Sequence, residues 1–394
     1  MAPRKVIIVG AGTAGITVAA QLQRRAHDRL SIAIIDPQET HYYQPLWTLV
    51  GAGVFEHAAS ERRTRELIPA GVEWIKQKVR SFLPDQKSLV LADGSTHSYD
   101  YLVVAPGIQL DWKKIKGLPE ALNTPGVCSN YALYGSKKTF QEVQALKGGK
   151  AIFTQPRLPI KCAGAPQKAM YMSEDYWQRQ GVRGDIEVVF ASHGPRIFGV
   201  EKYKLSLEKV VARKKIVTAY EHDLIEVRPE TREAVFERPD KTHVVMPYDL
   251  LHVVPPQSAP DFIKQSPLVD KDGWVEVDKF TLQHPRFPEI FSLGDASSLP
   301  TSRTGAAIRK EAPVLVANLL AHLAGKPLTA KYNGYTSCPL VTGAGTAIIA
   351  EFDYDGNPVE TFPFDQAKER WSMWLLKAYL LPKMYWYGML KGRA

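Results

Sequence analysis

Hydrophobic residues in the first part of the chain occur in short runs separated by an amphipathic stretch. Lys5 to Val9, KVIIV, is the kind of apolar run that forms a buried parallel strand. A helical pattern follows from Ile16, and a second apolar run, Ser31 to Ile35, ends at Asp36. This order of strand, helix and strand predicts a βαβ unit at the start of the chain.

The turn between the first predicted strand and its helix has the spacing G-x-G-x-x-G at Gly10, Gly12 and Gly15. The first glycine permits a tight turn, the second lets a pyrophosphate approach the backbone, and the third lets the helix pack closely on the strand. The helix N-terminus offers free N–H groups to phosphates. Asp36 lies where a carboxylate accepts hydrogen bonds from a ribose. The pattern predicts a dinucleotide site, and a glycine-rich turn without a ligand is the alternative.

Two later segments, Tyr99 to Gly107 and Tyr248 to Pro256, resemble each other. Each begins with Tyr-Asp, continues as an apolar strand and ends at a proline turn. Each also follows a stretch that predicts a β-meander, residues 74–91 and 224–245. Chance similarity of two buried strands is the alternative. We favour an α/β protein with two Rossmann-like dinucleotide-binding domains, the second inserted in the first.

The second copy lacks the residues of a nucleotide-binding turn. Its first strand, Lys150 to Thr154, is followed by Gln155-Pro-Arg-Leu-Pro-Ile. Pro156 and Pro159 have no N–H to donate, and no glycine lets a phosphate reach the backbone. The next strand, Asp185 to Ala191, ends without an acid for a ribose. We therefore expect the second fold to have no NAD(P)H site, so that another reductant supplies the electrons.

A further predicted strand begins at Glu289 and ends in Gly294-Asp295, and a helical run opens after Thr304. An aspartate in this place can reach the ribityl chain of a flavin, and a helix N-terminus can stabilise negative charge on a reduced ring. An aspartate that only caps the next helix is the alternative.

Four further segments of the chain resemble motifs of a known protein family. The segments that carry the resemblance are His41 to Trp47, Lys161 to Lys168 (KCAGAPQK), Tyr335 to Thr342 (YTSCPLVT) and Glu360 to Gln366. They resemble the mitochondrial-type branch of sulfide:quinone oxidoreductase, within the two-dinucleotide-domain flavoproteins of the disulfide-reductase group. The resemblance spans essentially the whole chain. It implies oxidation of hydrogen sulfide, with FAD as cofactor and a membrane quinone as the electron-accepting substrate.

The resemblance also implies which residues contact FAD. The pyrophosphate would lie against the glycine-rich turn and the adenosine ribose against Asp36. The implied set is Gly10, Gly12, Ala14, Gly15, Asp36, Gln44, Val79, Asp295, Gly305, Ala306, Ala307 and Ile308. Arg303 stands where a lysine is common in the family, which leaves open the side chain at the flavin's pyrimidine edge.

Cys162 and Cys338 are the implied catalytic pair, and Lys161 and Lys168 can favour thiolate over thiol. By the family's logic, HS⁻ attacks the oxidised pair and leaves Cys338 as a persulfide and Cys162 as a thiolate. Two electrons then pass to FAD and on to quinone, and a small thiol or sulfite takes the sulfane sulfur. A buried structural cysteine is the alternative for either residue. For Cys128, both a flavin or sulfur role and an inert loop cysteine stay open.

The formal net charge of +9 over 394 residues fits an anionic membrane surface, nucleic acid or small anionic substrates. In residues 368–394 cations alternate with aromatic side chains, and only Glu369 opposes them. This composition suits the headgroup region of an anionic bilayer. We expect Pro382 to break the segment into two short membrane-docking helices. A helix pair on the core or in a dimer contact is the alternative, and the quinone ring is expected near Phe362 and Phe364.

The predicted division is therefore an FAD-binding domain in two parts, 1–110 and 281–330, an inserted second fold at 111–280 and a C-terminal quinone- and membrane-docking segment at 331–394. We expect a peripheral protein at a bacterial inner membrane or on the mitochondrial inner membrane. No apolar run reaches the length of a spanning helix. Strand-like sequence from Lys5 argues against a signal or transit peptide, although a removed presequence stays open.

Other classes of function find less support in the sequence. No nucleic-acid motif accompanies the basic residues, and no metal site is expected because the histidines lack metal-ligand spacing. The oligomeric state is left open, a dimer included. Two rival functions remain: a type II NADH:quinone dehydrogenase of the same fold, and a non-catalytic flavin-containing sensor of sulfane sulfur.

Overall fold

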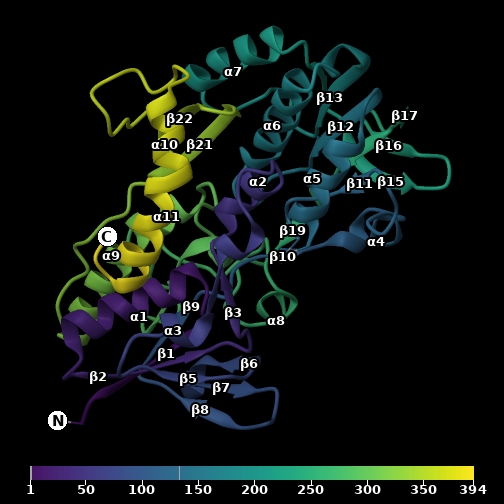
Figure 1. The fold of residues 1–394 in the computed structure, drawn as a ribbon. Coiled ribbons are helices and arrows are strands. Elements are labelled where there is room, and N and C mark those ends of the chain that lie inside the picture. Colours follow the sequence, from purple (N-terminus) through teal and green to yellow (C-terminus); the bar gives the residue numbers. More distant parts are fainter. Residues whose placement is uncertain (1, 133) are drawn as a thin grey trace.

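The computed structural model describes residues 2–132 and 134–394. A five-stranded parallel sheet forms the centre of the first α/β unit (Figure 1). Its strands, in spatial order, are β20 (Ile290–Ser292), β9 (Tyr101–Val104), β1 (Arg4–Val9), β2 (Leu30–Ile35) and β5 (Glu73–Ile75). Val6, Ile7 and Ile8 of β1 are fully buried, as expected of a central strand with packed layers on both faces. The expected βαβ unit is confirmed.

Two helices cover one face of this sheet, and smaller elements cover the other. α1 (Thr13–Ala26) and α9 (Gly305–Leu323) pack against each other on the first face. The opposite face packs on a small antiparallel sheet and a short helix, which are β6 (Val79–Leu83), β7 (Ser88–Leu91), β8 (Thr96–Ser98) and α8 (Asp261–Lys264). Short elements lie between these parts: β3 (Thr40–Tyr42), α2 (Trp47–Val50), β4 (Glu61–Arg63) and α3 (Thr64–Leu67).

A second five-stranded parallel sheet repeats the architecture, which confirms the expected α/β fold. Its strands, in spatial order, are β11 (Val127–Cys128), β18 (Leu250–His252), β12 (Gly149–Gln155), β13 (Ile186–Ser192) and β14 (Val217–Tyr220). The helices of this unit are α4 (Leu118–Ala121), α5 (Gly135–Ala145), α6 (Ala165–Arg179) and α7 (Glu201–Arg213). The predicted meander at 224–245 is the antiparallel sheet of β15 (Asp223–Arg228), β16 (Glu233–Glu237) and β17 (His243–Pro247).

Two connections cross between the units side by side. β10 (Gln109–Leu110) pairs antiparallel with β19 (Gln257–Ser258), one entering and one leaving the second unit. After β19, Ile263 and Trp274 pack into the core of the first sheet, although the sequence prediction assigned residues 111–280 to the inserted fold. The domain boundaries stay a prediction.

The C-terminal part of the chain begins with a hairpin and ends in a long helical segment. The hairpin strands are β21 (Thr336–Gly343) and β22 (Thr346–Phe352). The segment consists of α10 (Trp371–Leu375), a π-helical turn (Leu376–Leu380), α11 (Leu381–Lys383), a second π-helical turn (Met384–Gly388) and a 3-10 turn (Met389–Lys391). In Figure 1 it runs as one yellow column from β21 and β22 down to α1 and α9.

The expected break at Pro382 is therefore wrong. Pro382 lies inside a continuous run of helical turns, and the wider i→i−5 spacing of the π-type turns on each side accommodates its ring and its missing N–H. Within the described residues, no helix has both the length and the apolar character that crossing a membrane requires.

The glycine-rich turn depends on close backbone contacts. A Cβ atom at Gly15 would lie 1.8 Å from the carbonyl oxygen of Gly10, so any side chain there forces α1 away from β1. We expect Gly15→Ala to lower the free energy of unfolding by about 3 kcal/mol in urea titrations. Gly184 is exposed and has open space around its Cα, so Gly184→Ala should change this free energy by less than about 0.5 kcal/mol. Equal losses in the two variants would contradict the packing argument.

Candidate functional site

Cys162 and Cys338, 176 positions apart, meet with their sulfur atoms 3.8 Å from each other. Cys162 lies just before α6, and Cys338 lies in the middle of β21. α6 packs along β21, and this packing brings the two side chains together. Both cysteines belong to one apolar cluster, with Cys338 buried and Cys162 partly accessible. The structure therefore joins the two predicted catalytic residues in one site.

The backbone at Cys162 is held in an uncommon conformation. Its φ angle is +51°, in the left-handed region that non-glycine residues seldom occupy. The Cys162 N–H donates to the Arg303 carbonyl at 2.8 Å, and the Cys162 carbonyl accepts from the Ala165 N–H at 2.7 Å. A conformation of this kind costs roughly 1–3 kcal/mol and persists because such bonds determine it from both sides.

A buried lysine sets the charge of the sulfur pair. The Lys168 ammonium donates to the Cys162 sulfur at 3.2 Å from the first turns of α6. The pKa of Cys162 is held well below that of an ordinary thiol by the hydrogen bond from Cys338 and, against the effect of burial, by Lys168. The pKa of Cys338 is raised because it keeps the proton of the pair. Cys162 is thus the thiolate and Cys338 the thiol.

Lys377 is a functional candidate that the sequence analysis missed. It belongs to the C-terminal segment, yet its side chain is buried and donates to the Pro45 carbonyl at 2.8 Å. Burial, with a contribution from Lys168, lowers its pKa to about 7. In the sequence it looks like one more cation of a membrane-facing tail, and only its i, i+3 spacing from the buried Trp374 distinguishes it.

Lys161, the other predicted thiolate-stabilising residue, has different partners. Its ammonium donates to the Gln44 side chain at 2.7 Å and lies 5.4 Å from the centre of the Trp47 ring. Burial lowers its pKa to about 8, with an opposing effect from Asp295. Lys161 therefore links the cysteine loop to the first α/β unit and leaves Lys168 as the direct sulfur contact.

Arg303 connects the sulfur pair to the Gly294-Asp295 motif. Its carbonyl holds the Cys162 N–H, and its side chain donates to the backbone carbonyls of Asp295 at 2.8 Å and Ser297 at 3.3 Å. The guanidinium also stacks on the Trp274 ring at 3.9 Å. Burial raises the pKa of Asp295, opposed by Arg303 and Lys161. The sulfur pair and the predicted flavin-binding aspartate thus share one structural support.

The residues at the glycine-rich turn fit a dinucleotide such as FAD. A Cβ at Gly12 would meet no atom within 4 Å, so there is open space in front of the N-terminus of α1. The Asp36 carboxylate accepts from the Ala11 and Gln38 N–H groups, each at 2.7 Å, which fixes it beside this space. Each carboxylate oxygen keeps a second acceptor site for a ribose hydroxyl. Burial raises the pKa of Asp36, and these N–H groups oppose the rise.

In the second part of the predicted FAD site, a carboxylate and a helix N-terminus are free to contact a cofactor. Within residues 2–132 and 134–394, no donor reaches the Asp295 carboxylate. At the N-terminus of α9 the Thr304 hydroxyl caps the Ala307 N–H at 3.0 Å, while the residues from Gly305 to Ile308 form the first helical turn. A flavin would find a carboxylate and a helix N-terminus here, the two elements predicted for its ribityl chain and ring.

The remaining predicted residues lie in mixed surroundings. Val79 is buried at the start of β6. Phe362 and Phe364 stack on each other with ring centres 5.3 Å apart, and both are half-buried.

Cys128 is fully buried in β11, and burial raises its pKa to about 12. This environment favours an inert structural cysteine over a role in the flavin or sulfur chemistry. In the part of the chain that the structure describes, no group of His, Cys, Asp and Glu side chains could hold a metal ion.

A cavity of about 520 Å³ opens next to the cysteine loop, where the second fold would have its nucleotide turn. Gln155 to Leu158 line one side, and Ala163 and Ser302, the neighbours of Cys162 and Arg303, line another. Arg157, His193 and Arg196 also belong to the wall, so the cavity has a basic character.

Comparisons with known proteins place this geometry in context. Residues 4–313 match the family described as pyridine nucleotide-disulphide oxidoreductase. The mitochondrial sulfide:quinone oxidoreductase of Mus musculus is 47% identical over 391 residues, covering 98% of this chain and 86% of the relative. The corresponding protein of Dictyostelium discoideum is 46% identical, covering 99% and 86%. The solved sulfide:quinone oxidoreductase of Aquifex aeolicus has a TM-score of 0.86 at 18% identity, covering 99% and 92%.

Replacing Lys168 tests the electrostatics of the site. In the reduced protein, Lys168→Met removes the cation that favours the Cys162 thiolate, so the thiol pKa rises and the thiolate fraction at pH 7 falls. We expect iodoacetamide to alkylate Cys162 at least tenfold more slowly at pH 7, with the rate profile shifted to higher pH, as measured by mass spectrometry. Lys161→Met is the control, because its ammonium contacts Gln44 rather than sulfur. An unchanged profile in Lys168→Met would refute the assignment.

Proposed function

The chain belongs to the sulfide:quinone oxidoreductases of the pyridine nucleotide-disulphide oxidoreductase family, and from this premise we propose how its own residues perform the reaction. It is an FAD-dependent enzyme that oxidises sulfide and reduces quinone. The observation that carries the residue assignment is the pair of sulfur atoms 3.8 Å apart with an ammonium 3.2 Å from one of them.

We assign Cys162 and Cys338 to the sulfur chemistry. In the oxidised enzyme of this scheme the two sulfurs are joined directly in a disulfide; with one further sulfur between them, the same attack would leave Cys162 as a persulfide anion and not as a thiolate. HS⁻ attacks the Cys338 sulfur, the bond toward Cys162 breaks, and its electron pair stays on Cys162 as a thiolate. Cys338 then carries the new sulfur as a persulfide. Lys168 makes Cys162 a good leaving group because its ammonium stabilises the thiolate.

FAD, when bound, takes up two electrons from the sulfur pair and passes them to quinone. The residues proposed to hold FAD are those that the family resemblance implies. The turn at Gly12 would contact the pyrophosphate, Asp36 the ribose and Asp295 the ribityl chain. Arg303 supports this proposal because it ties the Asp295 backbone to the Cys162 backbone, and would thereby hold a flavin bound at Asp295 beside the sulfur pair. The quinone ring stays assigned to the neighbourhood of Phe362 and Phe364.

The basic cavity is the proposed entry for the sulfur acceptor. A small thiolate or sulfite is an anion, and Arg157 and Arg196 would attract it to the wall beside Ala163. From there the acceptor takes the outer sulfur of the Cys338 persulfide and leaves a thiolate. Loss of two electrons from the two thiolates then restores the bridge. The same turn has prolines where a pyridine nucleotide needs N–H donors, which argues against NADH as the reductant.

The C-terminal segment is the proposed membrane contact. Its exposed side chains are strongly apolar: Trp371 is 65% exposed, Leu380 57% and Tyr387 67%. Exposed Lys383 and Lys391 accompany them. Aromatic, aliphatic and cationic groups together on one segment suit the headgroup region of an anionic bilayer. Its curated relatives with mitochondrial names agree with a location at the inner mitochondrial or an equivalent bacterial membrane.

Single cysteine variants test the sulfur chemistry. We expect Cys162→Ser and Cys338→Ser each to slow flavin reduction by sulfide at least 10³-fold in anaerobic stopped-flow absorbance, because serine cannot form a sulfur bridge. Cys128→Ser is the matched control and should keep its rate within about threefold, since Cys128 is buried in another strand. Normal rates in both active-site variants would exclude the scheme. Bleaching of the flavin by NADH would favour an NADH dehydrogenase instead.

Surface variants test membrane docking without disturbing the core. We expect Trp371→Ser with Leu380→Ser to lower the affinity for phosphatidylglycerol-containing vesicles by at least tenfold in sedimentation assays, because two large apolar groups no longer enter the bilayer. The control is Leu205→Ser on α7, which removes a leucine of similar exposure, 50%, from another surface. Equal effects of the two sets would argue against this docking surface.

A further inference from the structure

A buried tyrosine of the C-terminal segment is hydrogen-bonded to the glycine-rich turn. The Tyr385 hydroxyl lies 2.9 Å from the Thr13 hydroxyl and 2.5 Å from Nε2 of His41. Nδ1 of His41 lies 3.0 Å from the carbonyl oxygen of Ala11. Tyr385 is 3% exposed and His41 5% exposed. A chain of hydrogen bonds therefore runs from Ala11, in the turn after β1, through His41 and Tyr385 to Thr13, the first residue of α1.

The direction of each bond in this chain of hydrogen bonds follows from chemistry. The Ala11 carbonyl can only accept, so Nδ1 of His41 carries its hydrogen. Burial lowers the pKa of His41 to about 4, so the ring is neutral and Nε2 accepts from the Tyr385 hydroxyl. The oxygen of Tyr385 is then the acceptor for the Thr13 hydroxyl. Each group in the chain of hydrogen bonds has a partner, and Tyr385 is the only member that comes from outside the first unit's N-terminal residues.

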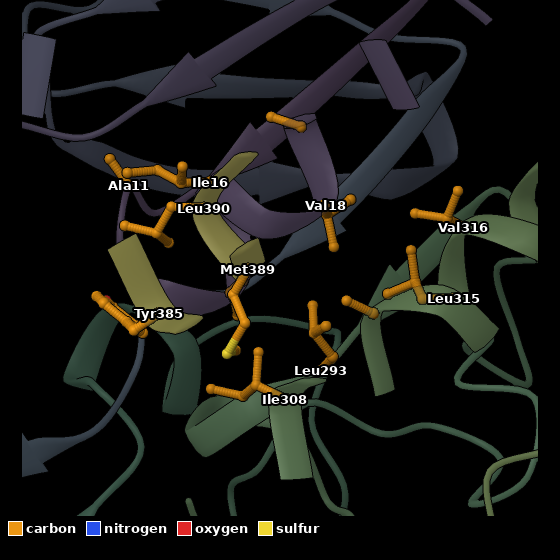
Figure 2. Close-up of a cluster of buried hydrophobic side chains, with 14 of the residues drawn as sticks. Ala11, Ile16, Val18, Leu293, Ile308, Leu315, Val316, Tyr385, Met389 and Leu390 are labelled. Carbon is orange, nitrogen blue, oxygen red and sulfur yellow. The ribbon is translucent and has the colours of Figure 1, made fainter. Parts of the chain in front are cut away.

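Apolar packing holds Tyr385 in this place. Figure 2 shows Tyr385, Met389 and Leu390 among side chains of the turn, of α1 and of α9, with Leu390 beside Ala11 and Ile16. The Tyr385 ring also lies 4.4 Å from the centre of the Tyr43 ring. At the end of the segment, a Cβ on Gly392 would lie 2.8 Å from the backbone of Ala20, so the chain touches α1 as closely as only glycine allows.

We propose that Tyr385 is a positioning residue for the cofactor: it fixes the turn from Gly10 to Gly15 in the conformation that binds the FAD pyrophosphate. This rests on the FAD contacts proposed above. Backbone N–H groups bind a phosphate well only when they are fixed before the ligand arrives, because ordering a glycine-rich turn costs conformational entropy. Tyr385 supplies that order through Thr13 and through His41, which holds the Ala11 carbonyl.

The consequence is that one segment serves the membrane and the cofactor with opposite faces. Tyr387 points to the outside, 67% exposed, while Tyr385 and Trp386 are buried against the first unit. Arg62 lies over the Trp386 ring at 4.9 Å and adds a further contact from the first unit. Removing the segment would therefore disturb cofactor retention as well as membrane binding.

The test is the rate of FAD release from the full-length holoenzyme, followed by the rise of free-flavin fluorescence after dilution. We expect Tyr385→Phe to release FAD about tenfold faster than the wild type, because the Thr13 hydroxyl and the His41 ring nitrogen that it leaves unpaired loosen the turn. The matched control is Tyr203→Phe. It removes a similarly buried tyrosine hydroxyl, which donates from α7 of the second unit to the Glu351 carbonyl of β22, and FAD release should stay at the wild-type rate.

A double variant separates positioning from general destabilisation. If Tyr385 acts through Thr13, the variant Tyr385→Phe with Thr13→Val should release FAD no faster than the faster single variant. Full additivity, wild-type release in Tyr385→Phe, or equal acceleration in Tyr203→Phe would each overturn the inference. If the wild-type protein holds FAD and Tyr385→Phe releases it at the wild-type rate, only this inference is overturned. A wild-type protein that holds no FAD would overturn the proposed function as well.

Discussion

The contact between the Cys162 and Cys338 sulfurs is the constraint on which the rest of the structure depends. It requires α6 to pack on β21, and the loop before α6 to lie against the Arg303 carbonyl. The first requirement joins the second unit to the C-terminal hairpin, and the second joins it to the first unit. A left-handed conformation at Cys162 is part of the same arrangement. The interface among all three parts of the chain is therefore organised around one pair of atoms.

Positively charged lysines surround the sulfur pair, and burial strengthens their electrostatic effect on the sulfur atoms. Lys168 contacts the Cys162 sulfur, Lys377 lies buried nearby and Lys161 lies half-buried, and both of these have lowered pKa values. Lys168 and Lys377 stabilise the Cys162 thiolate, while burial lowers the pKa of Lys377 and so weakens its own charge. Asp295 is a nearby counter-charge on the cofactor side. This arrangement suits a site where an anion attacks sulfur and a thiolate must leave.

The C-terminal segment has an inner face as important as its outer one. A polar tail with several tryptophans and tyrosines can lie on a membrane without touching the protein core. Here Trp374, Tyr385 and Trp386 are buried, and only part of the aromatic set, with Trp371, Tyr379 and Tyr387, is exposed. Because the π-type turns keep the segment continuous past Pro382, it reaches from the hairpin that carries Cys338 to the helix behind the glycine-rich turn. The C-terminal segment thereby connects the sulfur site, the proposed membrane surface and the glycine-rich turn.

The sequence by itself determined the features that arise from neighbouring residues. The strand before Gly10, the helix after it, the second parallel sheet and the prolines in place of a nucleotide turn at Gln155 could all be predicted, because hydrophobic period and turn chemistry act over a few residues. The family could be recognised from short motifs around each cysteine. The tertiary structure decided that the two sulfurs meet, that Lys168 rather than Lys161 contacts them, and that Lys377 and Tyr385 face inward. These outcomes depend on packing between segments far apart in the chain, and the local pattern of a cation or an aromatic ring is the same whether it faces lipid or a buried sulfur.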